Sequence, residues 1–264
     1  MKKTILAGAA LVALGSGVNV AYAEEAAAQP EHAVAYNIGV ASEYRYRGIS
    51  QSRFEPALSG GADYTHNPSG FYVGAWGSTI KWISDAGKIA GVNTKGDVEI
   101  DIYAGKRGEI APDVSYDVGV LQYWYPSNTY EKVGATAVSA NTTEVYAQIG
   151  YGPAYLKYSH AVTDLFGNKG SDGSYYIDGG VNYPIAEGTL LNLHVGYQKV
   201  KNFSDLDYTD WKVGVTKDFG FVTGAIAIIG ADVKKTAAGD YAYMSPAGNN
   251  LGKTTAVVSL TKAF

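Results

Sequence analysis

The chain has 264 residues and no cysteine, which excludes disulfides and thiolate metal sites. Its formal net charge is −4 and its basic residues form no stripe, so the sequence offers no surface for nucleic acid. The 33 glycines and 22 tyrosines are instead typical of a tightly packed β-barrel with aromatic belts.

The first 23 residues have the organisation of a cleavable secretory signal. Lys2 and Lys3 precede a short apolar run, which ends in small residues at Ala23. This run is too short for a transmembrane helix, and no later segment has the roughly eighteen consecutive apolar residues that such a helix needs. We therefore expect cleavage after Ala23 and one mature domain, residues 24–264, which could span a membrane only with strands.

The mature chain shows alternation of apolar and polar side chains, the pattern of strands with one apolar face. In the clearest example, from Asp97 to Ala104, Val98, Ile100 and Ile102 share one face, and the acidic residues share the other. About twelve segments of this kind, each near the length of a tilted membrane strand, are predicted near 33–47, 55–66, 71–83, 97–107, 114–125, 143–151, 154–164, 174–184, 190–200, 209–219, 221–233 and 253–264.

The connections between these segments alternate between short and long. Residues 67–70 and 152–153 are short connections, whereas 126–142 and 234–252 are long ones. Outer-membrane barrels have short periplasmic turns and longer outer loops, and an even number of strands places both termini in the periplasm. The expected fold is therefore all-β, a transmembrane antiparallel up-and-down barrel in the bacterial outer membrane, reached by export through the periplasm.

The C-terminus is consistent with this fold. Phe264 ends the chain on the same strand face as Leu260 and Val258, although Lys262 interrupts the apolar pattern. A terminal aromatic residue on an apolar strand resembles the assembly signal that the outer-membrane insertion machinery reads. We therefore expect two partners, the lipid of the outer membrane and the insertion machinery bound through the C-terminal strand.

No constellation of catalytic or cofactor-binding residues is visible. The four histidines, His32, His66, His160 and His194, have no metal-ligand spacing among them. Ser159 and His160 are adjacent, so they point to opposite faces of a strand and cannot form a catalytic pair. The sequence therefore predicts a protein that is not an enzyme and has no metal site or cofactor.

Charged side chains on the inward faces are the candidate functional residues. Buried charges must pair or face water. These residues would either line a water-filled, mildly cation-favouring pore or close the lumen with salt bridges, and the sequence leaves both alternatives open. The predicted pore-lining residues are Glu43, Arg45, Arg47, Asp63, Asp97, Glu99, Asp101, Asp117, Glu144, Lys157, Asp178, Lys212 and Asp218.

The segment 44–52, YRYRGISQS, resembles the Y-x-F-R-G-x-S-Q signature of the TorF-like porins, a proteobacterial family long catalogued as having unknown function. The similarity continues to about residue 126, and Tyr46 stands where the family usually has Phe. The resemblance implies an outer-membrane barrel and a channel, and it supplies no catalytic residues. On the first strand, Arg45 and Arg47 would face the lumen, and Gly48 would permit a tight exit turn.

Three functions fit such a barrel. The first is a porin-like channel for the passive diffusion of small hydrophilic solutes. The second is a structural or adhesive barrel with a closed lumen. The third is an outer-membrane acyl hydrolase, which would need a Ser–His pair and an orienting Asn or Asp on one face, and none is visible. We expect the channel, with small hydrophilic solutes as its partners.

Overall fold

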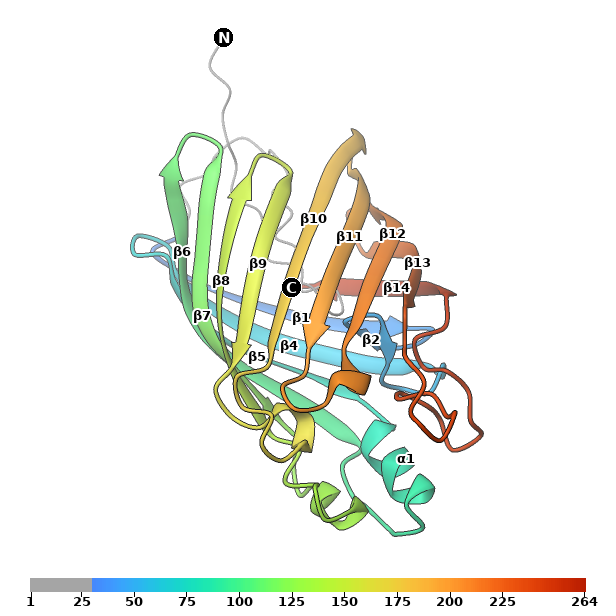
Figure 1. The fold of residues 1–264 in the computed structure, drawn as a ribbon. Helices are drawn as coiled ribbons and strands as arrows, with labels where there is room; N and C mark the ends of the chain where they lie inside the picture. Colours follow the sequence, from blue (N-terminus) through green and yellow to red (C-terminus); the bar gives the residue numbers. More distant parts are fainter. Residues whose placement is uncertain (1–29) are drawn as a thin grey trace.

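The alternating segments close into a ring of antiparallel strands, which the computed structural model describes over residues 30–264. The predicted signal peptide and its cleavage site at Ala23 lie outside the described residues. Pairing of β1 with both β4 and β14 closes the barrel (Figure 1). The barrel strands are β1 (His32–Ala41), β4 (Ala57–His66), β5 (Phe71–Thr79), β6 (Val98–Ala111), β7 (Val114–Trp124), β8 (Thr142–Tyr151), β9 (Ala154–Ala161), β10 (Tyr175–Ala186), β11 (Thr189–Lys199), β12 (Tyr208–Asp218), β13 (Thr223–Ala231) and β14 (Thr255–Ala263).

The twelve-stranded antiparallel barrel that the alternation predicts is confirmed. On β1, Val34, Tyr36 and Ile38 point outward and are 55–56% exposed, while the intervening residues face the lumen. Outward apolar side chains recur around the barrel, for example Val73 on β5 and Val195 on β11. Because a continuous apolar belt of this extent is unfavourable in water, the outer surface fits the hydrocarbon region of a bilayer.

The two ends of the barrel differ in their connections. Short turns join β4 to β5, β6 to β7, β8 to β9, β10 to β11 and β12 to β13, at the end where β1 begins and Phe264 lies. Longer connections at the opposite end carry α1 (Trp82–Ile89) and the single turns η1 (Tyr130–Val133), η2 (Leu165–Gly167) and η3 (Ser204–Leu206) (Figure 1). In barrels of this type the end with the short turns faces the periplasm.

Two strands end four to six residues before the point that the sequence pattern predicts. The segment 71–83 leaves the sheet after Thr79, and α1 begins at Trp82. The segment 33–47 leaves the sheet after Ala41. Alternation continues past both ends, so periodicity alone could not locate them. Among the residues that the structure describes, no helix is long and apolar enough to cross a membrane.

After Ala41 the chain folds into the barrel, and we call residues 42–54 the inner hairpin. Its two short strands, β2 (Arg45–Tyr46) and β3 (Ile49–Ser50), pair with each other and not with the barrel sheet. Arg47 and Gly48 form the turn between them, with φ values of 44° and 77°. A two-residue turn with positive φ at both positions is the type I′ turn, whose twist suits an antiparallel hairpin.

Candidate functional site

The tip of the inner hairpin lies directly against the barrel wall. A Cβ atom added at Gly48 would be 2.5 Å from the Asp210 Cβ on β12 and 3.2 Å from the Ala231 Cβ on β13. Glycine therefore serves two purposes at this position, since it adopts the positive φ of the turn without strain and allows the backbone to approach the wall.

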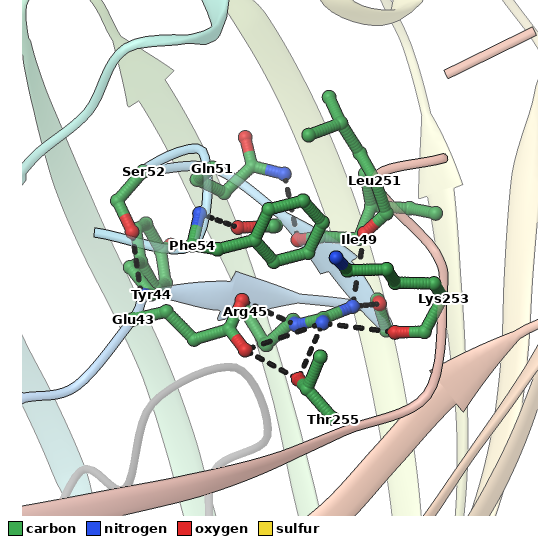
Figure 2. Close-up of polar contacts among 12 residues, drawn as sticks. Glu43, Tyr44, Arg45, Ile49, Gln51, Ser52, Phe54, Leu251, Lys253 and Thr255 are labelled. Atoms are coloured by element: carbon green, nitrogen blue, oxygen red, sulfur yellow. Dashed lines mark hydrogen bonds and ion pairs between the residues drawn. The ribbon is translucent and has the colours of Figure 1, made fainter. Parts of the chain in front are cut away.

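Arg45 anchors one side of the inner hairpin, as Figure 2 shows. Its Nε donates to Glu43 Oε2 at 2.8 Å, and both side chains are almost completely buried. The ring of Phe54 covers the guanidinium, with its centroid 5.3 Å from the Arg45 Cζ. The terminal nitrogens donate, at 2.6–3.0 Å, to the hydroxyl of Thr255 and the backbone carbonyls of Gly48, Leu251 and Lys253. Arg45 thus fastens the hairpin to the start of β14 and the loop before it.

Arg47 reaches the opposite side of the lumen. Its Nη1 and Nη2 donate to Glu144 Oε1 and Oε2 on β8 at 3.0 and 2.7 Å, and Nη1 also donates to Gln198 Oε1 on β11 at 2.7 Å. The guanidinium carbon lies 4.2 Å from the ring centroid of Tyr176 on β10. Bidentate pairing combined with stacking on an aromatic ring is an arrangement that arginine makes and lysine cannot.

The tyrosines beside the two arginines, Tyr44 and Tyr46, contact the wall at β6 and β7. Tyr44 donates to Glu99 Oε1 on β6 at 2.5 Å, and Tyr125 donates to Glu99 Oε2 at 2.8 Å. Tyr46 donates to the hydroxyl of Tyr123 on β7 at 2.7 Å. The sequence pattern extends the first strand through Tyr44 and Tyr46. The structure shows instead that both tyrosines and both arginines lie inside the barrel on the inner hairpin.

The outer end of the inner hairpin is held by α1. Arg53 donates from Nε to Asp85 Oδ2 at 2.6 Å, and this hydrogen bonding raises the pKa of the Arg53 guanidinium. The backbone N–H of Lys81 donates to the Gln51 carbonyl at 2.8 Å. Lys81 also donates to Glu55, and this hydrogen bond lowers the pKa of the Glu55 carboxyl. The hairpin is therefore bonded to the barrel and to the outer loops along its whole length.

A second polar cluster lies on the lumen wall next to Arg47. His194 on β11 has its Nε2 3.0 Å from Asp210 Oδ1 and its Nδ1 3.6 Å from Asp178 Oδ2. Tyr176 donates to Asp210 Oδ2 at 2.8 Å, and the Tyr155 hydroxyl lies 3.1 Å from His194 Nδ1. Sequence reasoning missed His194 and Asp210 as lumen residues. Their inward position on β11 and β12 was the only signal that could have revealed them.

The predicted pore-lining residues do not all occupy the same environment. Two of the acids, Asp63 and Asp101, each have one carboxylate oxygen, Oδ2 and Oδ1 respectively, that is buried without a hydrogen-bond partner among the described residues. Further toward the periplasm, Asp117 accepts a hydrogen bond from Tyr72 at 2.6 Å, and the Lys157 Nζ lies 4.2 Å from the ring centroid of Tyr146. The residues that the inner hairpin and the His194 cluster bring together are Glu43, Arg45, Arg47, Glu99, Glu144 and Asp178.

The three remaining predicted pore-lining residues are Asp97, Asp218 and Lys212. Asp97 is exposed and lies directly before β6, so it is not part of the strand wall. The alternation extends one residue past the strand, and only the strand boundary separates Asp97 from the wall. Asp218 ends β12 at the periplasmic rim, where its Oδ1 accepts from the Gly220 N–H at 2.7 Å. Lys212 lies on β12 two residues along from Asp210, on the same inward face.

Comparison with known proteins agrees with the barrel fold. A family model described as "Bacterial protein of unknown function (Gcw_chp)" matches residues 25–264. Among solved structures, the chain is similar to the NanC porin, with 12% identity and a TM-score of 0.51 over 88% of this chain and 99% of that one. It is also similar to an outer-membrane channel from Pseudomonas putida F1, with 13% identity and a TM-score of 0.48 over 90% and 97%. A third similar structure is LpxR from Salmonella typhimurium, with 10% identity and a TM-score of 0.40 over 87% of this chain and 99% of that one.

No curated protein matches the chain. The likeness to the NanC porin shows the fold, an outer-membrane barrel, and this fold indicates the outer membrane as the location. The resemblance of segment 44–52 to TorF-like porins is therefore confirmed in part: the chain matches a bacterial family and folds as such a barrel. The TorF-like name itself is not confirmed.

Proposed function

The chain belongs to the bacterial family of unknown function Gcw_chp, and we propose that it is an outer-membrane channel for the passive diffusion of small hydrophilic solutes. The observation that carries this proposal is the position of the inner hairpin. It bonds to β6, β7 and β8 on one side of the lumen and to β14 on the other, near the outer end. Polar side chains, among them Asp63, Asp117 and Lys157, point inward from the wall on the periplasmic side. The hairpin would be the constriction of the channel.

Two further features support the proposal. A polar interior behind an apolar belt is the arrangement of barrels that conduct solutes across the outer membrane. A loop that folds into the lumen and is held by paired charges narrows the path and sets an upper limit on solute size. The barrel fold that the chain shares with the NanC porin is compatible with this function.

The second candidate function is a structural barrel with a closed lumen. The completeness of the hydrogen bonding around Arg45 and Arg47 favours it, because paired charges in a dry plug need no water. An acyl hydrolase is not supported by the described residues. Ser159 is buried facing the lumen, whereas His160 is hydrogen-bonded to Tyr158 on the outer face of β9.

We also propose how the protein is exported and inserted into the outer membrane. Residues 1–23 would be removed on export, so N-terminal sequencing of the protein from outer membranes should begin at Glu24. The backbone of Phe264 pairs with Tyr36 on β1, and its side chain is 72% exposed at the periplasmic rim. The insertion machinery would recognise this terminal strand, and deletion of Phe264 should reduce the heat-modifiable folded band on gels.

The swelling of proteoliposomes in sugars of increasing size tests the proposed function. The folded protein should admit a pentose much faster than a trisaccharide, because the constriction excludes the larger sugar. Protein-free liposomes and liposomes with the heat-denatured protein are the controls. Swelling that is no faster than in these controls for every sugar would contradict the channel and favour the closed barrel.

A further inference from the structure

A group of metal-type ligands lies on the periplasmic rim, at the opposite end of the barrel from the inner hairpin. His32 begins β1 and His66 ends β4, and strand pairing places the two in register, with their ring centroids 5.2 Å apart. Glu31 precedes His32. Within residues 30–264, these three are the one group of His, Cys, Asp and Glu whose ligand atoms all lie within 4.8 Å of one another.

The distances from the Glu31 carboxylate to the two imidazoles are close to those between ligands of one bound ion. Glu31 Oε1 is 3.4 Å from His66 Nε2 and 3.7 Å from His32 Nε2. A tetrahedral zinc ion holds nitrogen and oxygen ligands at about 2.0–2.2 Å, which places neighbouring ligand atoms about 3.3–3.6 Å apart. The carboxylate therefore needs only small adjustments to share an ion with both imidazoles.

Both imidazole rings are oriented by hydrogen bonds to their other nitrogen. His32 Nδ1 lies 2.8 Å from the Tyr64 hydroxyl, and His66 Nδ1 lies 2.6 Å from Ser69 Oγ. The Ser69 hydroxyl donates to the His66 carbonyl at 3.3 Å, so its oxygen is available to accept from Nδ1–H. In that tautomer the lone pair of His66 Nε2 faces Glu31. Such second-shell contacts fix the tautomer and ring position of histidines that bind metals.

The backbone around Glu31 is fixed as well. The N–H of Asn67, in the turn after β4, donates to the Glu31 carbonyl at 3.0 Å. The Asn67 side chain donates to the Pro30 carbonyl at 2.7 Å. The Glu31, His32 and His66 side chains are 67%, 60% and 31% exposed, so water can reach the remaining coordination positions of an ion.

We propose that Glu31, His32 and His66 form a binding site for a divalent transition metal of the zinc class on the periplasmic rim. Two neutral imidazoles and one carboxylate are a ligand set that suits Zn²⁺, and water completes its tetrahedron. The bound ion ties the start of β1 to the end of β4. The site is independent of the proposed channel. Sequence spacing did not reveal it, because strand register brings His32 and His66 together.

Calorimetric titration with Zn²⁺ tests the site on the whole protein, folded in detergent, stripped with chelator and carrying no histidine tag. We expect one saturable site per chain. His66→Ala and the double variant His32→Ala with His66→Ala should lose this binding, because each removes a ligand. Tyr64→Phe should weaken it about 10–100-fold, the usual effect of removing a second-shell partner.

His160→Ala is the matched control, since His160 also lies on a strand and also bonds a tyrosine hydroxyl, that of Tyr158. It should bind Zn²⁺ as the wild type does, and heat-modifiable mobility on gels should show that every variant folds. The proposal is overturned if the wild type has no saturable site, or if the double variant binds Zn²⁺ as tightly as the wild type. Neither outcome bears on the sugar permeability that tests the channel.

Discussion

At the scale of single residues, the turn at Arg47 and Gly48 determines whether the inner hairpin can lie against the wall. Alanine at position 48 would combine a left-handed backbone with a Cβ only 2.5 Å from that of Asp210. Gly220 also has a positive φ, of 83°, but an added Cβ there would meet nothing within 4 Å. The two glycines therefore separate the effect of conformation from that of close approach.

We expect Gly220→Ala to lower the free energy of unfolding by about 1–2 kcal/mol, the penalty for a left-handed alanine. Gly48→Ala should cost about 1–3 kcal/mol more, the usual effect of overpacking. Urea unfolding of both variants in lipid vesicles measures the difference. Equal losses in the two variants would mean that the hairpin tip does not touch β12.

The pair between Arg47 and Glu144 gives a second test at this scale. Its two side chains are 4% and 2% exposed, so Glu144→Gln leaves a buried guanidinium without its carboxylate. We expect a loss of about 3–5 kcal/mol in unfolding free energy. Asp172→Asn is the control, because Asp172 and Lys201 form an exposed pair, 61% and 49% exposed, whose loss should cost at most about 1 kcal/mol. Similar losses of unfolding free energy from both substitutions would mean that the Arg47 side chain is exposed to water and not buried.

At the scale of elements, β6 tests which face of the wall meets lipid. Ile102 and Ile110 both point outward from β6, but Ile110 lies near the periplasmic turn. An arginine near the bilayer midplane costs about 2–4 kcal/mol, and this cost falls to about 0–1 kcal/mol near the interface. Ile102→Arg should therefore reduce the unfolding free energy in vesicles by more than Ile110→Arg. The reverse order would require a different position of β6 in the bilayer.

The individual strands and helices show which parts of the fold the sequence could predict and which it could not. Strands such as β7 and β12 follow from alternation, because one face meets lipid and the other meets the lumen. The inner hairpin did not follow from it, since residues 44–47 continue the same alternation although they have left the sheet. The helix α1 was missed for a similar reason, because apolar residues on both sides of Thr79 hid the end of β5.

The candidate site was predictable only residue by residue. Alternation correctly turned Glu99, Glu144 and Asp178 inward. It could not show that Arg47 pairs with Glu144, because that contact joins residues from different parts of the chain across the lumen. It also could not show the His194 cluster, whose members come from four neighbouring strands.

At the scale of the whole molecule, the acids that point inward from the wall, among them Asp63 and Asp101, should give the channel a cation preference. Changing both residues to Asn should move the reversal potential toward anions at low salt, and the difference should fade as salt screens the charges. Asp97→Asn is the control, because Asp97 is exposed and lies before the first residue of β6, so its loss should change the reversal potential less. If Asp97→Asn shifted the reversal potential and the double variant did not, the ion path would pass Asp97 and not Asp63 and Asp101.

The conductance of single channels in planar bilayers tests most directly whether the inner hairpin constricts the lumen. We would replace residues 43–54 of the inner hairpin with a glycine–serine segment of equal length, and as a control replace the exposed residues 237–240 of an outer loop in the same way. Heat-modifiable mobility on gels would show that both variants fold. The hairpin variant should conduct more than the wild type, whereas the loop variant should match the wild type. A folded hairpin variant with the same conductance as the wild type, or with none at all, would contradict the role of the hairpin as the constriction of a channel.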